Sequence, residues 1–136
     1  MPKLNQEQLL EIFDALKKEM KPYEKENVVA KMDIQGKYDL WAVGKVEAYG
    51  RQYPELGFCT IIVQSSYVGF YYMPIYGNES VREKLDPEFL KLLKGKACFH
   101  IKHVDKDVIK QVRDAMKIGY EAYKKMGWIK KPLGAK

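Results

Sequence analysis

The stretch FCTIIVQSSYVGFYYM, residues 58–73, decides the fold because two apolar segments flank a short polar one. Residues 58–64 and 67–73 are rich in β-branched and aromatic side chains, a composition typical of β-strands. The link Ser65-Ser66 is short enough for a hairpin turn. We therefore expect an antiparallel hairpin here, and the register of that hairpin decides which side chains face the core.

A hairpin loop of even length gives this segment two different faces. One face is almost entirely apolar and is expected to be the core face; it pairs Val63 with Val68, Ile61 with Phe70 and Cys59 with Tyr72. The other face mixes aromatic, polar and small residues, namely Phe58, Thr60, Ile62, Gln64, Tyr67, Gly69, Tyr71 and Met73. This mixture is what a half-hydrated or ligand-lined surface would carry.

Alternating patterns extend this sheet in both directions along the chain. Residues 27–53 alternate with period two up to a loop expected around Pro54, and residues 96–102 alternate again. Together with the hairpin they predict about five or six strands in an antiparallel sheet. The same alternation adds Lys31, Asp33, Asp39, Trp41, Glu47, Tyr49, Cys98, His100 and Lys102 to the second face.

Helical patterns flank the sheet. Asn5 and Gln8 have the spacing of a capping box before a helix over residues 5–20, and Asp105 is the expected N-cap of a long helix that ends at Gly127. Asn78 and Asp86-Pro87 are expected to begin two short helices. These elements predict an α+β fold with the N- and C-terminal helices packed on one face of the sheet.

The size and charge of the chain limit the classes of protein to consider. Its 136 residues, 46% hydrophobic and 31% charged, suit one globular domain, expected over residues 1–129 and followed by a basic tail at 130–136. No apolar run is long enough to span a membrane, and no apolar leader is evident, so we expect a cytoplasmic protein. The net charge is +6, with 12 Lys and Arg against 4 Asp and Glu from Lys94 onward.

The basic C-terminal third raises the question of nucleic-acid binding. Aromatic residues on a sheet can stack on bases, as they do in RNA-recognition sheets. However, YVGFYYM, residues 67–73, lacks the Lys/Arg-Gly-Phe/Tyr pattern of that module. A solvated helix face and a basic tail explain the charge more simply, so nucleic acid is disfavoured as a partner.

Few residues suggest reaction chemistry. Cys98, His100 and His103 are close in sequence, but two ligands on one strand make no metal site and no acid is evident to orient a Cys-His pair. A disulfide between Cys59 and Cys98 is disfavoured because Cys59 is expected in the core. Glu7, Glu11 and Asp14 follow one another on one side of the first helix and are the candidate metal ligands.

Several segments resemble one known family. YVGFYYMPIY at residues 67–76, LDPEFLKLLKGKACFHIKHVDKDVI at 85–109 and NVVAKMDIQGKYDLWA at 27–42 are similar to the small bacterial YdhG-like proteins, a family of largely unknown function. The resemblance covers about residues 5–129. It implies a compact α+β domain with helices packed on an antiparallel sheet. Some members are described as frataxin-like iron chaperones for iron–sulfur or haem assembly, a role in which Glu7, Glu11, Asp14 and Glu19 would be expected to take part.

These observations predict a small non-enzymatic binding domain whose partner is a small molecule or a protein. The aromatic sheet face is the candidate ligand site, with Tyr67, Tyr71, Met73, Trp41, Cys98 and His100 as its residues. Two alternatives remain open: an iron chaperone that uses the acidic helix, and a small-ligand binder or enzyme that uses the sheet face. A homodimer is a further alternative, because exposed aromatic patches often mark self-association.

Overall fold

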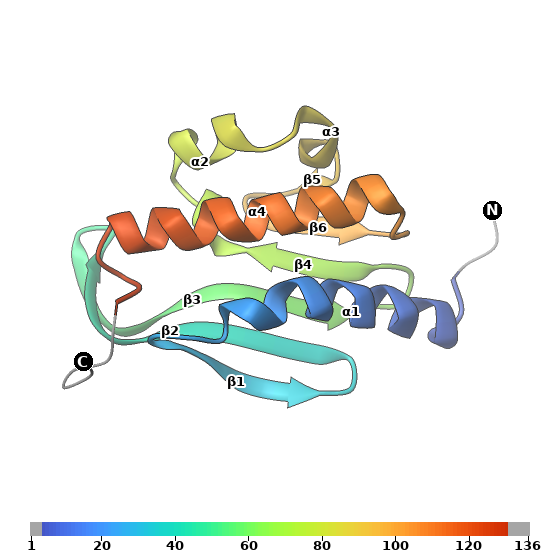
Figure 1. The fold of residues 1–136 in the computed structure, drawn as a ribbon, viewed down its shortest axis with the longest axis horizontal. Coiled ribbons are helices and arrows are strands. Elements are labelled where there is room, and N and C mark those ends of the chain that lie inside the picture. The colour runs from blue at the N-terminus through green and yellow to red at the C-terminus, as the bar shows by residue number, and fades with distance from the viewer. Residues whose placement is uncertain (1–3, 131–136) are drawn as a thin grey trace.

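One antiparallel sheet forms the base of the molecule, which the computed structural model describes over residues 4–130 (Figure 1). The six strands lie in the order β1-β2-β3-β4-β6-β5. Every neighbouring pair is antiparallel. The strands are β1 (Val28–Ile34), β2 (Lys37–Ala48), β3 (Arg51–Val63), β4 (Val68–Tyr72), β5 (Leu93–Lys94) and β6 (Cys98–Ile101).

Helices cover one face of this sheet. The two long helices, α1 (Gln6–Met20) and α4 (Lys106–Lys125), lie side by side across it. Two short helices, α2 (Glu79–Lys84) and α3 (Pro87–Leu90), lie in the connection from β4 to β5 (Figure 1). The predicted α+β class, with the N- and C-terminal helices on one face, is confirmed.

The helix starts agree with the capping residues expected from the sequence. The Gln8 N–H donates to Asn5 Oδ1 at 2.8 Å while the Asn5 N–H donates to Gln8 Oε1 at 2.9 Å, which completes a capping box. The Val108 N–H donates to Asp105 Oδ1 at 2.9 Å and starts α4. Gly127, with φ of +82°, takes the left-handed conformation that follows the end of α4.

The hairpin register expected for β3 and β4 is confirmed. Val63 lies opposite Val68, and the Gln64 N–H donates to the Tyr67 carbonyl at 2.9 Å to close the loop. The other predicted core pairs also form, and their members are fully buried: Ile61 with Phe70 and Cys59 with Tyr72. The opposite face of the hairpin therefore points away from the helices.

A β-bulge corrects the predicted position of Phe58. Leu40 pairs with Cys59, but the next residue of β2, Trp41, pairs with Gly57, which leaves Phe58 as the extra residue. The bulge turns Phe58 toward the helices, where it is fully buried with its ring centre 5.2 Å from that of Tyr123. The prediction that Phe58 lies on the second face is thus wrong.

A second bulge corrects the predicted face of Asp33. The register of β1 shifts between Ala30 and Met32, so Asp33 lies opposite the buried Tyr38. The Asp33 carboxylate accordingly forms an ion pair with Lys17 of α1, on the helix side of the sheet.

The loop predicted around Pro54 is also wrong. The turn lies earlier, at Tyr49-Gly50, where both residues have positive φ, and β3 continues through Pro54. Pro54 is tolerated because it lies opposite the register shift between Val43 and Val46, where regular ladder bonding is interrupted.

The predicted basic tail lies almost entirely outside the described residues. Its first residue, Lys130, donates its backbone N–H to Asn27 Oδ1 at 2.8 Å. The Asn27 amide in turn donates to the carbonyls of Val43 and Trp128, at 2.8 and 2.9 Å. This buried asparagine therefore joins the end of the domain to the start of β1 and to β2.

Close packing between α4 and the sheet depends on Gly119. The Tyr72 hydroxyl donates to the Ala115 carbonyl of α4 at 2.6 Å, which brings β4 against the helix. A Cβ at Gly119 would lie 2.7 Å from Pro74 Cγ and 2.8 Å from Tyr72 Oη, which is too close for real atoms. The helix can approach this part of the sheet only with glycine at this position.

We expect Gly119→Ala to destabilise the protein by about 1 to 3 kcal/mol, because the added methyl group must displace Pro74 or Tyr72. The same change in an exposed helix interior normally stabilises by about 1 kcal/mol. Urea unfolding followed by circular dichroism measures the difference. Lys117→Ala, at an exposed position of α4, is the control and should change the free energy of unfolding by less than about 0.5 kcal/mol. A Gly119→Ala protein as stable as the wild type would contradict this packing.

Candidate functional site

The face of the sheet opposite the helices carries a shallow hollow of about 340 Å³, which we call the outer groove. It lies over β2, β3, β4 and the start of the segment that follows β4. Its lining is mainly apolar, with a few polar groups. The lining residues are Lys37, Asp39, Trp41, Gly57, Thr60, Ile62, Tyr71 and Met73.

Gly57 leaves the space between two bulky walls of the groove. A Cβ on Gly57 would lie 3.8 Å from Met73 Cγ and 4.0 Å from the Trp41 ring, in ordinary contact with both. The bulge that turns Phe58 inward also sets Gly57 opposite Trp41. From the helix side, the Tyr123 hydroxyl donates to the Gly57 carbonyl at 2.7 Å and holds this backbone in place. A side chain at position 57 would therefore project toward Trp41 and Met73, and glycine leaves that part of the groove unfilled.

Tyr71 lies along the sheet instead of standing up from it. A Cβ on Gly69 would be 2.9 Å from Tyr71 Cε2, so the ring of Tyr71 occupies the space above Gly69. The Tyr71 hydroxyl accepts a hydrogen bond from Gln64 Nε2 at 3.3 Å. Glycine at position 69 thus makes room for the aromatic ring that forms one wall of the groove.

Some polar side chains of the groove form hydrogen bonds with one another. The Thr60 hydroxyl donates to Asp39 Oδ1 at 2.6 Å across the β2–β3 ladder. On the far side of Trp41, the Lys31 ammonium lies 4.8 Å from the centre of the indole ring and also pairs with Glu55. The indole is therefore held between a cation and the apolar hollow.

Tyr67 and His100 form a stacked pair farther along the outer face, toward the β5 edge. Their ring centres are 3.8 Å apart and their planes differ by 13°. His100 lies opposite Gly69 in the β4–β6 ladder. Burial lowers the pKa of the His100 imidazole, and the charges of Lys94 and Lys102 lower it further.

The six predicted ligand residues thus share one face but fall into two groups. Trp41, Tyr71 and Met73 line the outer groove, whereas Tyr67 and His100 do not. Cys98 lies opposite Tyr71 in the β4–β6 ladder, between the groups. Sequence reasoning missed Gly57, although an isolated glycine within a strand pattern is a known signal of a bulge or of close backbone approach.

Cys98 lacks the environment of an activated nucleophile. Burial raises the pKa of its thiol, and the nearby Tyr71 hydroxyl acts only partly in the opposite direction. Among the described residues, no hydrogen bond joins Cys98 to His100. Both cysteines are free thiols, as expected, and Cys59 is fully buried.

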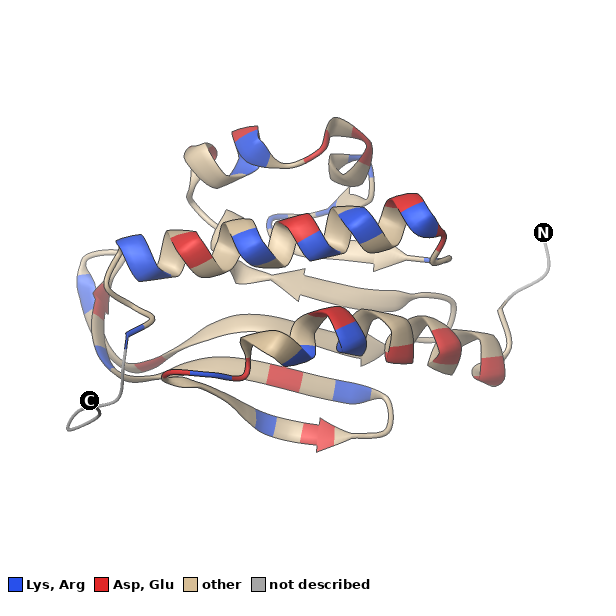
Figure 2. Ribbon diagram, in the orientation of Figure 1, with Lys and Arg blue, Asp and Glu red and all other residues tan. Residues whose placement is uncertain are grey.

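The three candidate metal ligands, Glu7, Glu11 and Asp14, are exposed residues of α1. Figure 2 shows acidic positions spread along this helix. They follow one another along the helix surface without converging on one point. Within residues 4–130, no group of three or more His, Cys, Asp or Glu side chains is placed to hold one metal ion.

Comparison with models of protein families, with curated proteins and with solved structures gave no significant match. The resemblance to the YdhG-like proteins therefore stays a prediction. In the described part of the chain, no helix combines the length and the apolar character needed to cross a membrane.

The reactivity of the thiols tests the assignment of Cys98 as a non-nucleophile. We expect one slowly reacting thiol in the native protein and two after unfolding, because Cys59 is inaccessible and the pKa of Cys98 is raised. Since the thiolate is the reacting species, the rate should keep rising as the pH passes the ordinary thiol pKa. Reaction with a chromogenic disulfide measures it, and Cys98→Ser should abolish the native reaction. A native thiol faster than free cysteine at neutral pH would refute the assignment.

Proposed function

We propose that this protein is a small, cytoplasmic, non-enzymatic binding domain that holds a flat, mainly apolar small molecule in the outer groove. The observation that carries the proposal is the hollow at Gly57 between Trp41 and Met73. Ligand sites typically combine apolar and aromatic walls with a few polar groups that orient the ligand. The outer groove has this composition.

The chemistry of each wall supports this class of ligand. Trp41 and Tyr71 provide aromatic surface that can stack on a planar group, and the Met73 thioether favours contact with aromatic rings. Lys37, Asp39 and Thr60 supply donors and acceptors on one side. A planar ligand with one polar edge would satisfy both sets of groups.

The raised pKa of Cys98 supports a binding role over catalysis. Nucleophilic cysteines in enzymes have lowered pKa values and an adjacent base. The thiol beside Tyr71 has neither, so the face offers contact surface without an activated group.

A neutral flat fluorophore, N-phenyl-1-naphthylamine, tests the groove. We expect saturable binding that quenches the fluorescence of Trp41, since the probe would lie against its indole ring. Gly57→Leu should weaken binding at least about tenfold, because its side chain fills the hollow. Met73→Gln, which leaves the backbone unchanged, should weaken binding in the same direction.

Ile34→Ser is the matched control, because Ile34 is an exposed apolar residue, 58% accessible, on β1 outside the groove lining. It should leave the affinity within about twofold of the wild type. Circular dichroism establishes that each variant is folded. Absence of saturable binding, or equal affinity in folded Gly57→Leu and wild-type proteins, would overturn the proposal.

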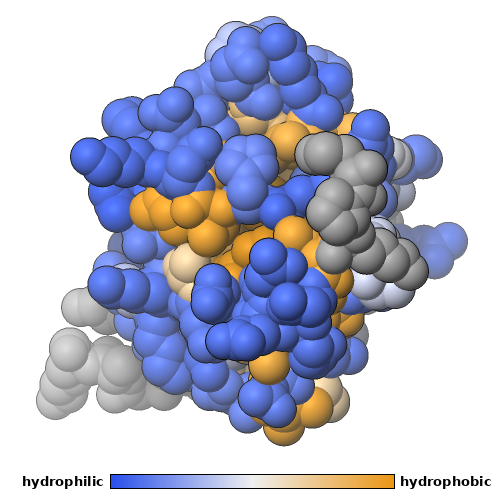
Figure 3. All heavy atoms as spheres, turned by 90° about the vertical axis from the view of Figure 1, so that its right-hand side faces the viewer, coloured by the Kyte–Doolittle hydropathy of each residue, from blue (hydrophilic) through white to orange (hydrophobic). Residues whose placement is uncertain are grey.

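A homodimer formed through the β1 edge of the sheet is the second candidate function. Apolar residues reach the surface among hydrophilic ones at the end of the molecule shown in Figure 3. On β1, at the edge of the sheet, Val29 and Met32 are each 38% exposed and Ile34 is 58% exposed. These side chains favour a partner chain added at β1. Sedimentation of wild-type and Ile34→Ser proteins distinguishes a dimer from a monomer.

The iron-chaperone alternative makes a separate prediction. Titration with Fe(II) should then perturb the backbone NMR signals of Glu7, Glu11 and Asp14 before those of other carboxylates. No response at millimolar iron would exclude this role, and the result would not bear on the groove.

A further inference from the structure

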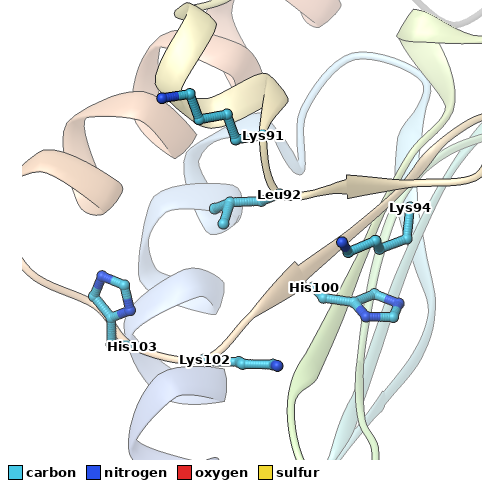
Figure 4. A pocket seen from close by; sticks show the side chains of 6 residues that line it. All are labelled: Lys91, Leu92, Lys94, His100, Lys102 and His103. Atoms are coloured by element: carbon cyan, nitrogen blue, oxygen red, sulfur yellow. The ribbon is translucent and has the colours of Figure 1, made fainter.

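A second concave site lies at the β5 edge of the sheet, and it differs in character from the outer groove. Its volume is about 210 Å³. Figure 4 shows its lining residues, which come from the end of α3, from β5 and β6, and from the segment that leads to α4. We call it the edge pocket, and its lining residues are Lys91, Leu92, Lys94, His100, Lys102 and His103. It shares no lining residue with the outer groove.

Every titratable side chain that lines the edge pocket is basic. Two of them have an acidic neighbour: Lys91 Nζ lies 3.0 Å from Glu88, and His103 Nε2 lies 3.4 Å from Asp105. Lys94 and Lys102 form no ion pair with any other residue between 4 and 130. Two ammonium groups thus face one hollow without a protein carboxylate to balance them.

The short length of β5 brings these cations together. α3 ends at Leu90, and only Leu93 and Lys94 form β5. The Leu92 carbonyl still accepts the His100 N–H at 3.0 Å, so Lys94 and His100 are held on adjacent strands. β6 then ends at Ile101, and Lys102 and His103 follow directly at the rim.

The His100 ring is held in place in the pocket, and the positive charges of Lys94 and Lys102 affect its pKa. The ring stacks on Tyr67, the residue just before β4, with ring centres 3.8 Å apart, which limits its rotation. Burial lowers the pKa of the His100 imidazole, and the charges of Lys94 on β5 and of Lys102 just after β6 lower it further. Lys91 and His103 complete the lining of the pocket. A neutral imidazole retains one N–H donor, so it can bind an anion before it is protonated.

We propose that the edge pocket binds a phosphate group. The ammonium groups of Lys94 and Lys102 would supply the charge, and the imidazole N–H of His100 would supply a directed hydrogen bond. Lysine is a common phosphate ligand that acts as a point charge. A dianion with several acceptor oxygens can be reached at once by Lys94 on β5 and by His100 and Lys102 on and just after β6, whereas a carboxylate offers a single charge and a planar pair of oxygens. This site is independent of the outer groove, so either proposal can fail alone.

Inorganic phosphate, titrated at constant ionic strength and followed by NMR, tests the proposal. We expect saturable shifts of the backbone and side-chain signals of Lys94, His100 and Lys102, with a dissociation constant in the millimolar range. The bound anion should raise the pKa of His100, because a negative charge favours the imidazolium form. The imidazole carbon and nitrogen shifts of His100 measure that change directly.

The double variant Lys94→Gln with Lys102→Gln should weaken phosphate binding at least about fivefold. Lys18→Gln with Lys117→Gln is the matched control, since both residues are exposed, lie on α1 and α4, and carry the same charge. It should leave the affinity unchanged. Equal weakening by both double variants would show attraction to net charge alone and overturn the proposal. Absence of saturable shifts, or equally tight binding of acetate, would overturn it as well.

Discussion

The pairing of β3 with β4 is the constraint on which the rest of the structure depends. Because side chains alternate along a strand, one step in register would exchange the core set, which includes Ile61 and Phe70, with the outer set, which includes Tyr71. In the observed register the apolar set is fully buried beneath α1 and α4. Burial of that set therefore favours this register strongly, and the same register directs Tyr71 and Thr60 to the outer face.

Glycines decide how closely the parts of this domain approach. Gly119 lets α4 contact Pro74 and Tyr72, so the helix lies directly on the sheet. On the other face, Gly69 makes room for the Tyr71 ring and Gly57 leaves a hollow. Gly119 allows the core to close, whereas Gly69 and Gly57 shape the outer surface. The outer groove is thus a consequence of small residues placed beside aromatic ones, and its walls need no flexible loop.

The outer groove and the edge pocket differ in chemistry. The outer groove is mainly apolar and aromatic, with a limited polar side, whereas the edge pocket is lined by lysines and histidines. The Tyr67–His100 stack belongs to the outer face and also contributes to the edge pocket. The charge of the C-terminal third of the chain is accordingly not spread evenly. On α4, acidic residues lie among the more numerous basic ones (Figure 2). At the sheet edge, Lys94 and Lys102 face one pocket and have no acidic partner in residues 4–130.

The sequence by itself determined the fold class, the helix caps at Asn5 and Asp105 and the hairpin register, because each depends on local spacing and on the apolar pattern. It also grouped Trp41, Tyr71 and Met73 on one face. Only the tertiary structure decided the position of Phe58, since Gly57 can signal a bulge but the pairing of β3 with β2 determines which residue is left over. The edge pocket likewise depends on the tertiary structure. The pairing of β5 with β6 sets Lys94 opposite Cys98 and so places it beside the strand that carries His100.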